Sequence, residues 1–327
     1  MQSYFEGKAF LVTGGTGSFG KKFVEILLNE YNPKTIRVYS RGELMQSEMD
    51  QKIQDPRLSF LIGDVRDKSR LSRAMNSVDV VVHAAALKQV PACEYNPIEA
   101  VRTNIDGTVN IIDAAIDNAV KKVMLISTDK AVHPVNLYGA TKMVAEKLIV
   151  QGNSYTGGNP PLFSCVRYGN VIGSRGSVIP LFKEQKNTGT ITITNEKMTR
   201  FWISLDQGVR FVINSIKIMQ GGEIFVPKIP SMRLIDLAEA IAPNAKKKYI
   251  GIRAGEKLHE VLITEDEARH TKEYDQWFII EPEHVFWNRK KQNNGKTLPE
   301  GFRYSSEKNQ DWLNKEDLIK ITQLEKQ

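Results

Sequence analysis

Hydrophobic and polar positions alternate regularly over the first half of the chain. Short runs that are apolar almost throughout predict strands, and the amphipathic segments between them predict helices. The predicted strands are KAFLVTG, TIRVYSR, RLSFLIGD, VDVVVHAAA and VKKVMLISTD. The predicted helices are GKKFVEILLNEY, KSRLSRAMNS and PIEAVRTNIDGTVNIIDAAIDN, with a further helix after the last strand. Strands without a polar face are typical of a parallel sheet covered on both sides, so the pattern predicts a doubly wound α/β (Rossmann) fold.

The second half of the chain is less regular and begins with a turn-rich break at GNSYTGGNPP. Strands are predicted at FSCVRYGNVIG, TITIT and EIFVP, and helices at LDQGVRFVINSIKIMQ, LIDLAEAIAP and GEKLHEVLI. We expect a Rossmann domain over residues 1–170, to which a helix and a strand around 206–226 return. Residues 171–205 and 227–327 are expected to form a smaller, mixed α/β substrate-binding domain.

The composition of the 327-residue chain is that of a soluble globular protein, with 41% hydrophobic and 25% charged residues. No apolar run approaches the ~20 residues of a membrane-spanning helix, and the first one leads straight into a glycine turn, unlike a signal peptide. The two cysteines, Cys93 and Cys165, form no disulfide framework and no metal-ligand spacing. We therefore expect no metal site, no membrane association and a cytoplasmic location.

The chain has a net charge of +7 and two basic clusters, KKK at 246–248 and RKKQNNGK from Arg289. Clustered positive charge can bind nucleic acid, but neither cluster is interleaved with aromatic residues. Solvated loops are the simpler interpretation, and attraction of an anionic small substrate is a third one. We expect no nucleic-acid partner.

The segment VTGGTGSFGKK carries Gly14, Gly17 and Gly20 between a predicted strand and a predicted helix. That position is typical of a dinucleotide-binding turn. Gly14 permits the tight turn, Gly17 lets the backbone approach a pyrophosphate at the helix N-terminus, and Gly20 allows close packing of the helix on the strand. The other candidate residues of this turn are Thr16, Ser18 and Phe19.

The end of the second predicted strand indicates which dinucleotide binds. An acidic residue there would accept a hydrogen bond from the ribose 2′-hydroxyl, but this strand ends with Ser40 and Arg41. A hydroxyl and a guanidinium suit a 2′-phosphate, so the sequence favours NADP over NAD. If Arg41 only stacks on adenine, either cofactor remains open. Asp64 is expected near the adenine amino group, unless it only caps its loop, and further cofactor contacts are expected from Val65 and Ala84.

Tyr138 and Lys142 form a Y-x-x-x-K pair that opens a helix after the strand ending in Thr128. Such a pair alone is common on helix surfaces, but together with the glycine turn it resembles the short-chain dehydrogenase/reductase superfamily, extended branch. The resemblance implies that Tyr138 exchanges a proton with a substrate hydroxyl, with Thr128 beside it, while hydride passes to or from nicotinamide. It also implies that Lys142 lowers the pKa of the tyrosine, ordinarily ~10, and holds the nicotinamide ribose.

Asp129 and Lys130 follow Thr128 directly and are more than a dehydrogenase needs. An acid and an amine at this place suggest a second proton-transfer step, an elimination. In the sugar-nucleotide 4,6-dehydratases the corresponding stretch is Thr-Asp-Glu, in which the acid helps water leave C6 and the base removes the C5 proton. This sequence departs from that pattern because Lys130 stands where the Glu would be.

Five segments together resemble the inverting UDP-N-acetylglucosamine 4,6-dehydratases: STDKAVHPVNLYGATK, HAAALKQVPACEYNPIEAVRTN, RYGNVIGSRGSVIPLF, MTRFWIS and GIRAGEKLHE. The resemblance covers residues 5 to 290 and implies a catalytic set of Asp129, Lys130 and Tyr138. It implies dehydration of the sugar at C4 and C6 with inversion at C5, the first step of pseudaminic acid synthesis for flagellin glycosylation. A homo-oligomer, either a dimer or a hexamer, and transfer of the product to an aminotransferase are implied as well.

The same resemblance implies further site residues. Lys88 would face both substrate and cofactor, and Asn170 would contact the sugar nucleotide. Arg200 and Arg253 would bind the diphosphate, which suits a guanidinium fork. Asn170 could instead be a turn residue, and the two arginines could form surface ion pairs. His83 is interpreted as a packed strand residue rather than as an acid or base.

Three other functions remain open from the sequence. A sugar-nucleotide 4-epimerase would use Thr128, Tyr138 and Lys142 but has no use for Asp129 and Lys130. A retaining 4,6-dehydratase would return the C5 proton to the face that it left. A non-catalytic NADP-sensing regulator belongs to another class, and such proteins often lack the tyrosine that this chain has.

Overall fold

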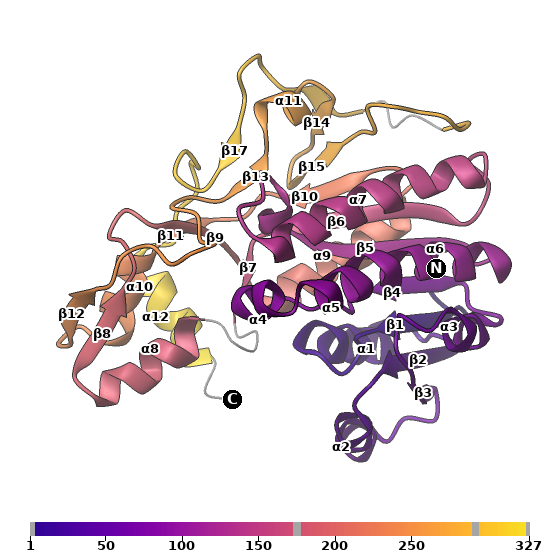
Figure 1. The fold of residues 1–327 in the computed structure, drawn as a ribbon, viewed down its shortest axis with the longest axis horizontal. Coiled ribbons are helices and arrows are strands. Elements are labelled where there is room, and N and C mark those ends of the chain that lie inside the picture. The colour runs from indigo at the N-terminus through magenta and orange to yellow at the C-terminus, as the bar shows by residue number, and fades with distance from the viewer. Residues whose placement is uncertain (1–3, 173–177, 290–293, 325–327) are drawn as a thin grey trace.

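A ten-stranded sheet forms the centre of the protein in the computed structural model, which describes residues 4–172, 178–289 and 294–324 (Figure 1). Seven neighbouring strands are parallel, in the order β3 (Leu58–Ile62), β2 (Thr35–Ser40), β1 (Ala9–Thr13), β4 (Val80–His83), β5 (Lys122–Thr128), β6 (Leu162–Tyr168) and β10 (Ile224–Pro227). Beyond β10 the sheet continues with the antiparallel strands β15 (Trp277–Ile280), β14 (Thr271–Glu273) and β16 (Lys296–Thr297). Parts of two segments named above, 173–177 and 290–293, lie outside the described residues.

Successive residues of a strand point to opposite sides of the sheet. Both sides carry apolar side chains here, and helices cover both. Phe10 and Val12 of β1 belong to one hydrophobic core, and Leu11 between them belongs to another. The first core is covered by α1 (Ser18–Glu30) and α9 (Leu205–Ile218), and the second by α3 (Lys68–Met75), α6 (Gly107–Asp117) and α7 (Leu137–Tyr155). This two-sided packing confirms the predicted doubly wound α/β fold.

A smaller lobe with its own hydrophobic core lies on the left of Figure 1. Its elements are α8 (Val178–Asn187), β8 (Thr190–Ile193), α10 (Leu234–Ile241), β12 (Lys246–Tyr249) and α12 (Lys315–Leu324). Two small sheets accompany it, one of β7 (Asn170–Val171), β9 (Thr199–Ile203) and β11 (Ser231–Arg233), the other of β13 (Val261–Ile263) and β17 (Tyr304–Ser305). The lobe mixes strands and helices, and its role in substrate binding stays a prediction.

The large sheet uses more of the C-terminal half than the pattern predicted. The helix α9 and the strand β10 return to it, as expected for residues around 206–226. The strands β14, β15 and β16 also hydrogen-bond into it, although residues 227–327 were expected in the smaller domain. Antiparallel strands need no crossover helix, so the alternation of strand and helix does not reveal them. The division into two domains at the expected boundaries remains a prediction.

The predicted helix at GEKLHEVLI is wrong. Gly255 has a left-handed φ of +76°, and the segment continues through turns into β13. The carbonyl oxygens of Lys257 and Leu258 accept hydrogen bonds from Arg200, at 3.0 and 3.1 Å, instead of from a following helical turn. The apolar residues that suggested a helix include Val261–Ile263, which form β13 and are buried in the core.

Other helices differ from the pattern in smaller ways. The expected long helix consists of α5 (Pro97–Val101), a π-helical turn (Arg102–Asp106) and α6. The helices that the pattern missed are α2 (Glu43–Ile53), α4 (Val90–Tyr95) and α11 (Glu265–Ala268), besides α8 and α12. In α2 only two side chains are buried, so its sequence has little of the periodicity that indicates a helix.

The two basic clusters differ in their surroundings. Residues 246–248 are exposed, as expected, but they lie in the strand β12 and not in a loop. Arg289 is instead buried and paired with Glu223 and Glu281, at 3.4 and 3.1 Å, so the interpretation as a solvated loop is wrong for this residue. Both cysteines are buried and form no disulfide. Within the described ranges, every helix is too short or too polar to span a lipid bilayer.

His83, at the end of β4, generates a prediction about stability. Its ring is buried, with Nδ1 2.7 Å from the Thr13 hydroxyl and Nε2 3.4 Å from the Thr108 hydroxyl, so it packs within the fold as expected. Burial, assisted by the charge of Lys142, lowers the pKa of His83 from 6.5 to about 3. The unfolded chain therefore binds a proton that the folded chain does not, and stability should fall as the pH decreases from 6.5 towards 3.

We expect His83→Gln to remove this part of the pH dependence. The free energy of urea unfolding of the unaltered protein should fall by about 1.4 kcal/mol per pH unit more than that of the variant in this window. The exposed His284 offers the matched substitution His284→Gln, which should leave the slope unchanged. Parallel curves for the unaltered protein and His83→Gln would contradict the assignment.

Candidate active site

The candidate site residues follow the carboxyl ends of neighbouring parallel strands. Gly14 follows β1, Arg41 follows β2, Asp64 comes shortly after β3, Asp129 follows β5 and Asn170 comes shortly after β6. Because β3, β2, β1, β4, β5 and β6 are adjacent and parallel, these strand ends meet at one edge of the sheet. Ligands of doubly wound folds bind at this edge.

The glycine turn has the geometry of a dinucleotide cradle. Gly14 has a φ of +67°, and a Cβ atom there would lie 2.9 Å from Cα of Ala85. A Cβ atom on Gly20 would overlap the backbone of Gly15, so α1 packs directly against the turn. Gly17 precedes α1 and caps it with no side-chain hydrogen bond, which leaves the helix N-terminus suited to a phosphate. The residues therefore fit a nicotinamide dinucleotide.

The residues expected around the adenosine end are present at the ends of β2 and β3. The side chain of Arg41 is 59% exposed, and its Nη1 lies 3.9 Å from Oδ2 of Asp64. Burial raises the pKa of Asp64, but hydrogen bonds from Arg66 outweigh burial and bring the pKa below its ordinary value. Asp64 also accepts from the backbone N–H of Arg66 at 3.0 Å, so it caps its own loop, which was the simpler alternative. The hydroxyl of Ser40 accepts a hydrogen bond from Gln46 at 2.9 Å.

The remaining predicted cofactor residues line the same region of the chain. Thr16 and Val65 are buried, and the backbone N–H of Ala84 donates to the carbonyl of Thr13 at 3.2 Å. Lys88 is exposed in the loop after β4. The structure thus brings these residues to the strand ends, while their contacts with a cofactor stay predictions.

Thr128, Asp129 and Lys130 form a compact hydrogen-bonded group at the end of β5. A short 3-10 turn, Asp129–Ala131, redirects the chain there. Oδ1 of the fully buried Asp129 accepts hydrogen bonds from the Thr128 hydroxyl at 2.9 Å and from Nζ of Lys130 at 3.0 Å. The carboxylate of Asp129 and the amine of Lys130, adjacent in sequence, are therefore also close enough for a proton to pass between them.

Lys130 has two further polar neighbours from distant parts of the chain. Its Nζ lies 3.5 Å from Oδ1 of Asn170 and 3.7 Å from Oε1 of Glu260. Burial alone would lower the pKa of Lys130, but the carboxylates of Asp129 and Glu260 outweigh it and raise the pKa above its ordinary value. Lys130 is therefore an ammonium at neutral pH in this structure.

Tyr138 lies in the first turn of α7, beside this group. Asn136 caps the helix by accepting from the N–H of Gly139 at 2.7 Å. A Cβ atom on Gly139 would overlap the carbonyl oxygen of Lys130, so only glycine lets the helix approach the turn this closely. Burial raises the pKa of Tyr138 to about 12, opposed first by the charge of Lys130.

Lys142 has a different environment from the one predicted. Its ammonium is buried and donates to the carbonyl of Ile126 at 2.7 Å. Burial lowers the pKa of Lys142 to about 8. The charge of Lys130 opposes the raised pKa of Tyr138, because the turn after β5 brings Lys130 to the tyrosine. That Lys142 lowers the pKa of Tyr138 and holds the nicotinamide ribose stays a prediction.

The two arginines expected at the diphosphate lie in unlike places. Arg200 donates to the carbonyl oxygens of Thr199, Leu258 and Lys257 at 2.7 to 3.1 Å, and its Nε lies 3.9 Å from Glu260. In this structure the guanidinium therefore holds the 257–260 segment. Arg253 is half exposed and its Nη1 lies 3.7 Å from Glu256. Diphosphate binding by either residue stays a prediction.

Three residues at the site were missed by sequence reasoning. Glu260 is buried beside Lys130, and Lys257 lies 3.4 Å from it. Asn104, on the π-helical turn, bonds the backbone of Leu87 with both side-chain atoms, at 2.8 and 2.9 Å, and so fixes the loop that carries Lys88. A polar residue inside an apolar helix pattern was the signal for Asn104. Glu260 gave no separate signal, because its segment was interpreted as a helix.

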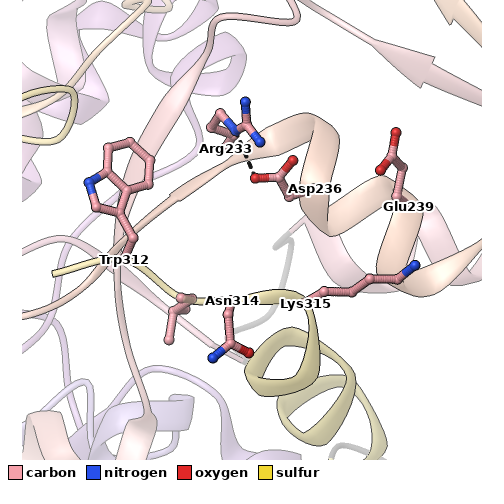
Figure 2. Close-up of a pocket in the computed structure, with 7 residues that line it drawn as sticks. Arg233, Asp236, Glu239, Trp312, Asn314 and Lys315 are labelled. Carbon is pink, nitrogen blue, oxygen red and sulfur yellow. Dashed lines mark hydrogen bonds and ion pairs between the residues drawn. The ribbon is translucent and has the colours of Figure 1, made fainter.

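A hollow of about 570 Å³ lies elsewhere, between α10 and the start of α12 (Figure 2). Its lining residues are Arg233, Asp236, Glu239, Trp312, Leu313, Asn314 and Lys315. None of the candidate site residues lines it, and its Arg233 is already paired with Asp236 at 2.8 Å. The described residues also contain no cluster suited to a metal ion.

The sequence matches the polysaccharide biosynthesis protein family over residues 10–282. The chain is 50% identical to the UDP-N-acetylglucosamine 4,6-dehydratase (inverting) of Campylobacter jejuni subsp. jejuni serotype O:2, over 97% of this chain and 98% of the relative. It is 42% identical to a UDP-glucose 4-epimerase of Rickettsia canadensis, over 84% of this chain and 83% of the relative.

Two solved structures share the fold. Pen from Bacillus thuringiensis has a TM-score of 0.90 and 41% identity over 99% of both chains. DesIV, the dTDP-glucose 4,6-dehydratase of Streptomyces venezuelae, was solved with NAD bound and has a TM-score of 0.69 and 25% identity, over 76% of this chain and 86% of that one. These similarities, together with the site geometry, show that the chain belongs to the polysaccharide biosynthesis protein family, alongside the inverting UDP-N-acetylglucosamine 4,6-dehydratases.

Proposed function

We propose that this chain is an inverting UDP-N-acetylglucosamine 4,6-dehydratase, a hydro-lyase. Its product would be UDP-2-acetamido-2,6-dideoxy-β-L-arabino-hexos-4-ulose. The observation that carries the proposal is the Asp129–Lys130 pair, hydrogen-bonded at 3.0 Å beside Tyr138. A 4-epimerase needs Thr128 and Tyr138 but not this pair, so the geometry favours the dehydratase among the curated relatives.

A nicotinamide dinucleotide in the glycine cradle would accept hydride from C4 and return it to C6. The chain itself supplies the proton transfers. Tyr138 must first lose its phenolic proton, which its raised pKa opposes and the charge of Lys130 assists. The phenolate then takes the proton of the C4 hydroxyl, with Thr128 beside it, and the resulting ketone acidifies the C5 proton. Transfer of a proton from Nζ of Lys130 to Oδ1 of Asp129 along their hydrogen bond leaves a neutral amine and a carboxylic acid. The amine can then take the C5 proton while the acid protonates the departing C6 hydroxyl.

Inversion requires that the new C5 proton arrive on the opposite face. Tyr138 holds the proton taken from the C4 hydroxyl and can deliver it to C5, which restores the phenolate. Lys130 and Asp129 end as ammonium and carboxylate, as they began, so the proton transfers form a closed cycle. The net change is the loss of one water molecule from the sugar.

The finer points of the proposal rest on particular side chains. Arg41, exposed at the end of β2, supports NADP rather than NAD as the cofactor. Exposed apolar side chains of Val109 on α6, and of Met143 and Tyr155 on α7, support a homo-oligomer, either a dimer or a hexamer. The free, buried cysteines agree with a cytoplasmic location. We place the reaction at the start of pseudaminic acid synthesis for flagellin glycosylation, with the 4-keto product passed to an aminotransferase.

Product analysis in heavy water tests the reaction directly. After incubation with UDP-N-acetylglucosamine, NMR should show the L-arabino product with deuterium at C5, because that proton comes from exchangeable groups. The new hydrogen at C6 should come from C4. The D-xylo product as first species would refute inversion, and absence of deuterium at C5 would refute elimination.

Lys130→Ala should remove the elimination and spare cofactor binding. We expect turnover to fall by about 10²- to 10⁴-fold, the usual contribution of a general acid or base, while the dissociation constant of the cofactor stays within twofold or so. The exposed Lys121, just before β5, provides the control Lys121→Ala, which should be fully active. Normal turnover of Lys130→Ala would contradict the assignment.

Arg41→Asp should move the cofactor preference from NADP towards NAD. Loss of a charge-assisted contact with the 2′-phosphate is expected to weaken NADP binding by about tenfold or more, measured by titration calorimetry. Arg269→Asp makes the same charge change at an 80% exposed side chain and should not alter the ratio. Equal affinity of the unaltered protein for both dinucleotides would count against the 2′-phosphate argument.

A further inference from the structure

Glu260 is a buried carboxylate surrounded by three cations. It is 2% exposed, and its oxygens lie 3.7 Å from Lys130, 3.9 Å from Arg200 and 3.4 Å from Lys257. Counted with Asp129, this cluster holds two carboxylates and three cations. None of the proton transfers described above uses Glu260.

Contacts from the end of the chain fix the backbone at Glu260. Its N–H donates to the hydroxyl of Ser306 at 2.9 Å, and its carbonyl accepts from the N–H of Ser306 at 2.8 Å. The same hydroxyl lies 2.6 Å from that of Thr199. The backbone of Glu260 is therefore fixed by Ser306, which in turn contacts Thr199, and both residues are distant from Glu260 in sequence. The side chain of Glu260 extends from this fixed backbone to Lys130.

The geometry differs from that of a carboxylate kept for stability. Arg167 binds two carboxylates, the buried Glu146 and the partly buried Glu267, and all four carboxylate oxygens accept hydrogen bonds, at 2.7 to 3.1 Å. Oε2 of Glu260 has no hydrogen-bond partner among the described residues, and its ion-pair distances are longer. A buried charge that is incompletely bonded destabilises the fold, so stability alone does not account for Glu260.

We propose that Glu260 is a positioning residue that holds the ammonium of Lys130, together with Asp129 and Asn170, where the substrate's C5–C6 bond must lie. This inference rests on the proposed function. Asp129 is the sequence neighbour of Lys130 and alone would draw the long side chain back to the end of β5. Glu260 attracts it from the 257–260 segment, so the ammonium is held between two separate parts of the fold.

Glu260→Gln keeps the size of the side chain and removes its charge. A lysine displaced by about an ångström should lower kcat by about tenfold to a hundredfold, while KM for UDP-N-acetylglucosamine stays within about threefold. Because Glu260 is one of two carboxylates that raise the pKa of Lys130, the pH step that Lys130 contributes to kcat should move to lower pH, by about one unit.

A second readout separates positioning from general damage. Tyr138 is the base in the oxidation at C4, and Lys130 stays in place as a charged neighbour in Glu260→Gln, so the first appearance of reduced nicotinamide in a single turnover should be nearly unchanged in this variant. Deuterium incorporation at C5 from heavy water should slow in parallel with kcat. Equal slowing of both steps, or an unshifted pH profile, would overturn the proposal.

Two further variants complete the experiment. Glu265→Gln makes the same charge change five positions along, at an exposed site, and should retain the kcat and pH profile of the unaltered protein. Glu260→Asp keeps the charge but withdraws it by about 1.5 Å, so it should fold even if Glu260→Gln does not and should slow C5 exchange less. Unaltered C5 exchange in Glu260→Asp would overturn the proposal.

The proposed function and this inference fail in different ways. If the unaltered protein forms no C5-deuterated product, both are overturned. If it forms that product and Glu260→Gln forms it equally fast, the function stands and only the role of Glu260 is lost.

Discussion

The burial of charged groups at the end of β5 constrains everything around it. Asp129 and Glu260 are almost fully enclosed, and ionised groups in an interior are tolerated only when they are paired and bonded. Lys130 forms an ion pair with each carboxylate, at 3.0 Å to Asp129 and 3.7 Å to Glu260, which requires that the turn after β5 and the 257–260 segment stay in contact. Gly139 then becomes obligatory, because any side chain there would collide with the carbonyl of Lys130.

A second buried network makes this arrangement rigid. Arg167 on β6 bonds Glu146 on α7 and Glu267 in α11, and it also donates to the carbonyl of Leu262 at 2.9 Å. The helix that presents Tyr138 is thereby tied to the same region of chain that presents Glu260. The candidate catalytic groups come from three separate segments, and this framework holds them in fixed positions.

The side chains around Lys130 carry more positive than negative charge, which would favour an anionic ligand. Lys130, Lys257 and Arg200 outnumber Asp129 and Glu260, so the cluster carries one excess positive charge. A net charge of +7 for the whole chain would add to the attraction of an anionic ligand. The third interpretation of the basic composition stays a prediction, and one of the clusters that prompted it, at Arg289, is a buried ion pair.

The sequence by itself determined the parallel strands, the glycine turn, the Tyr138–Lys142 pair and the Asp129–Lys130 pair, because each is written in contiguous residues with a local periodicity or spacing. The apolar spacing of GEKLHEVLI predicted a helix, but two of its carbonyl oxygens accept hydrogen bonds from Arg200 and the segment is not helical. Only the tertiary structure decided that Lys130 is charged and that Glu260 faces it. A pKa depends on burial and on neighbours, and these neighbours lie far apart along the chain, where no local pattern relates them.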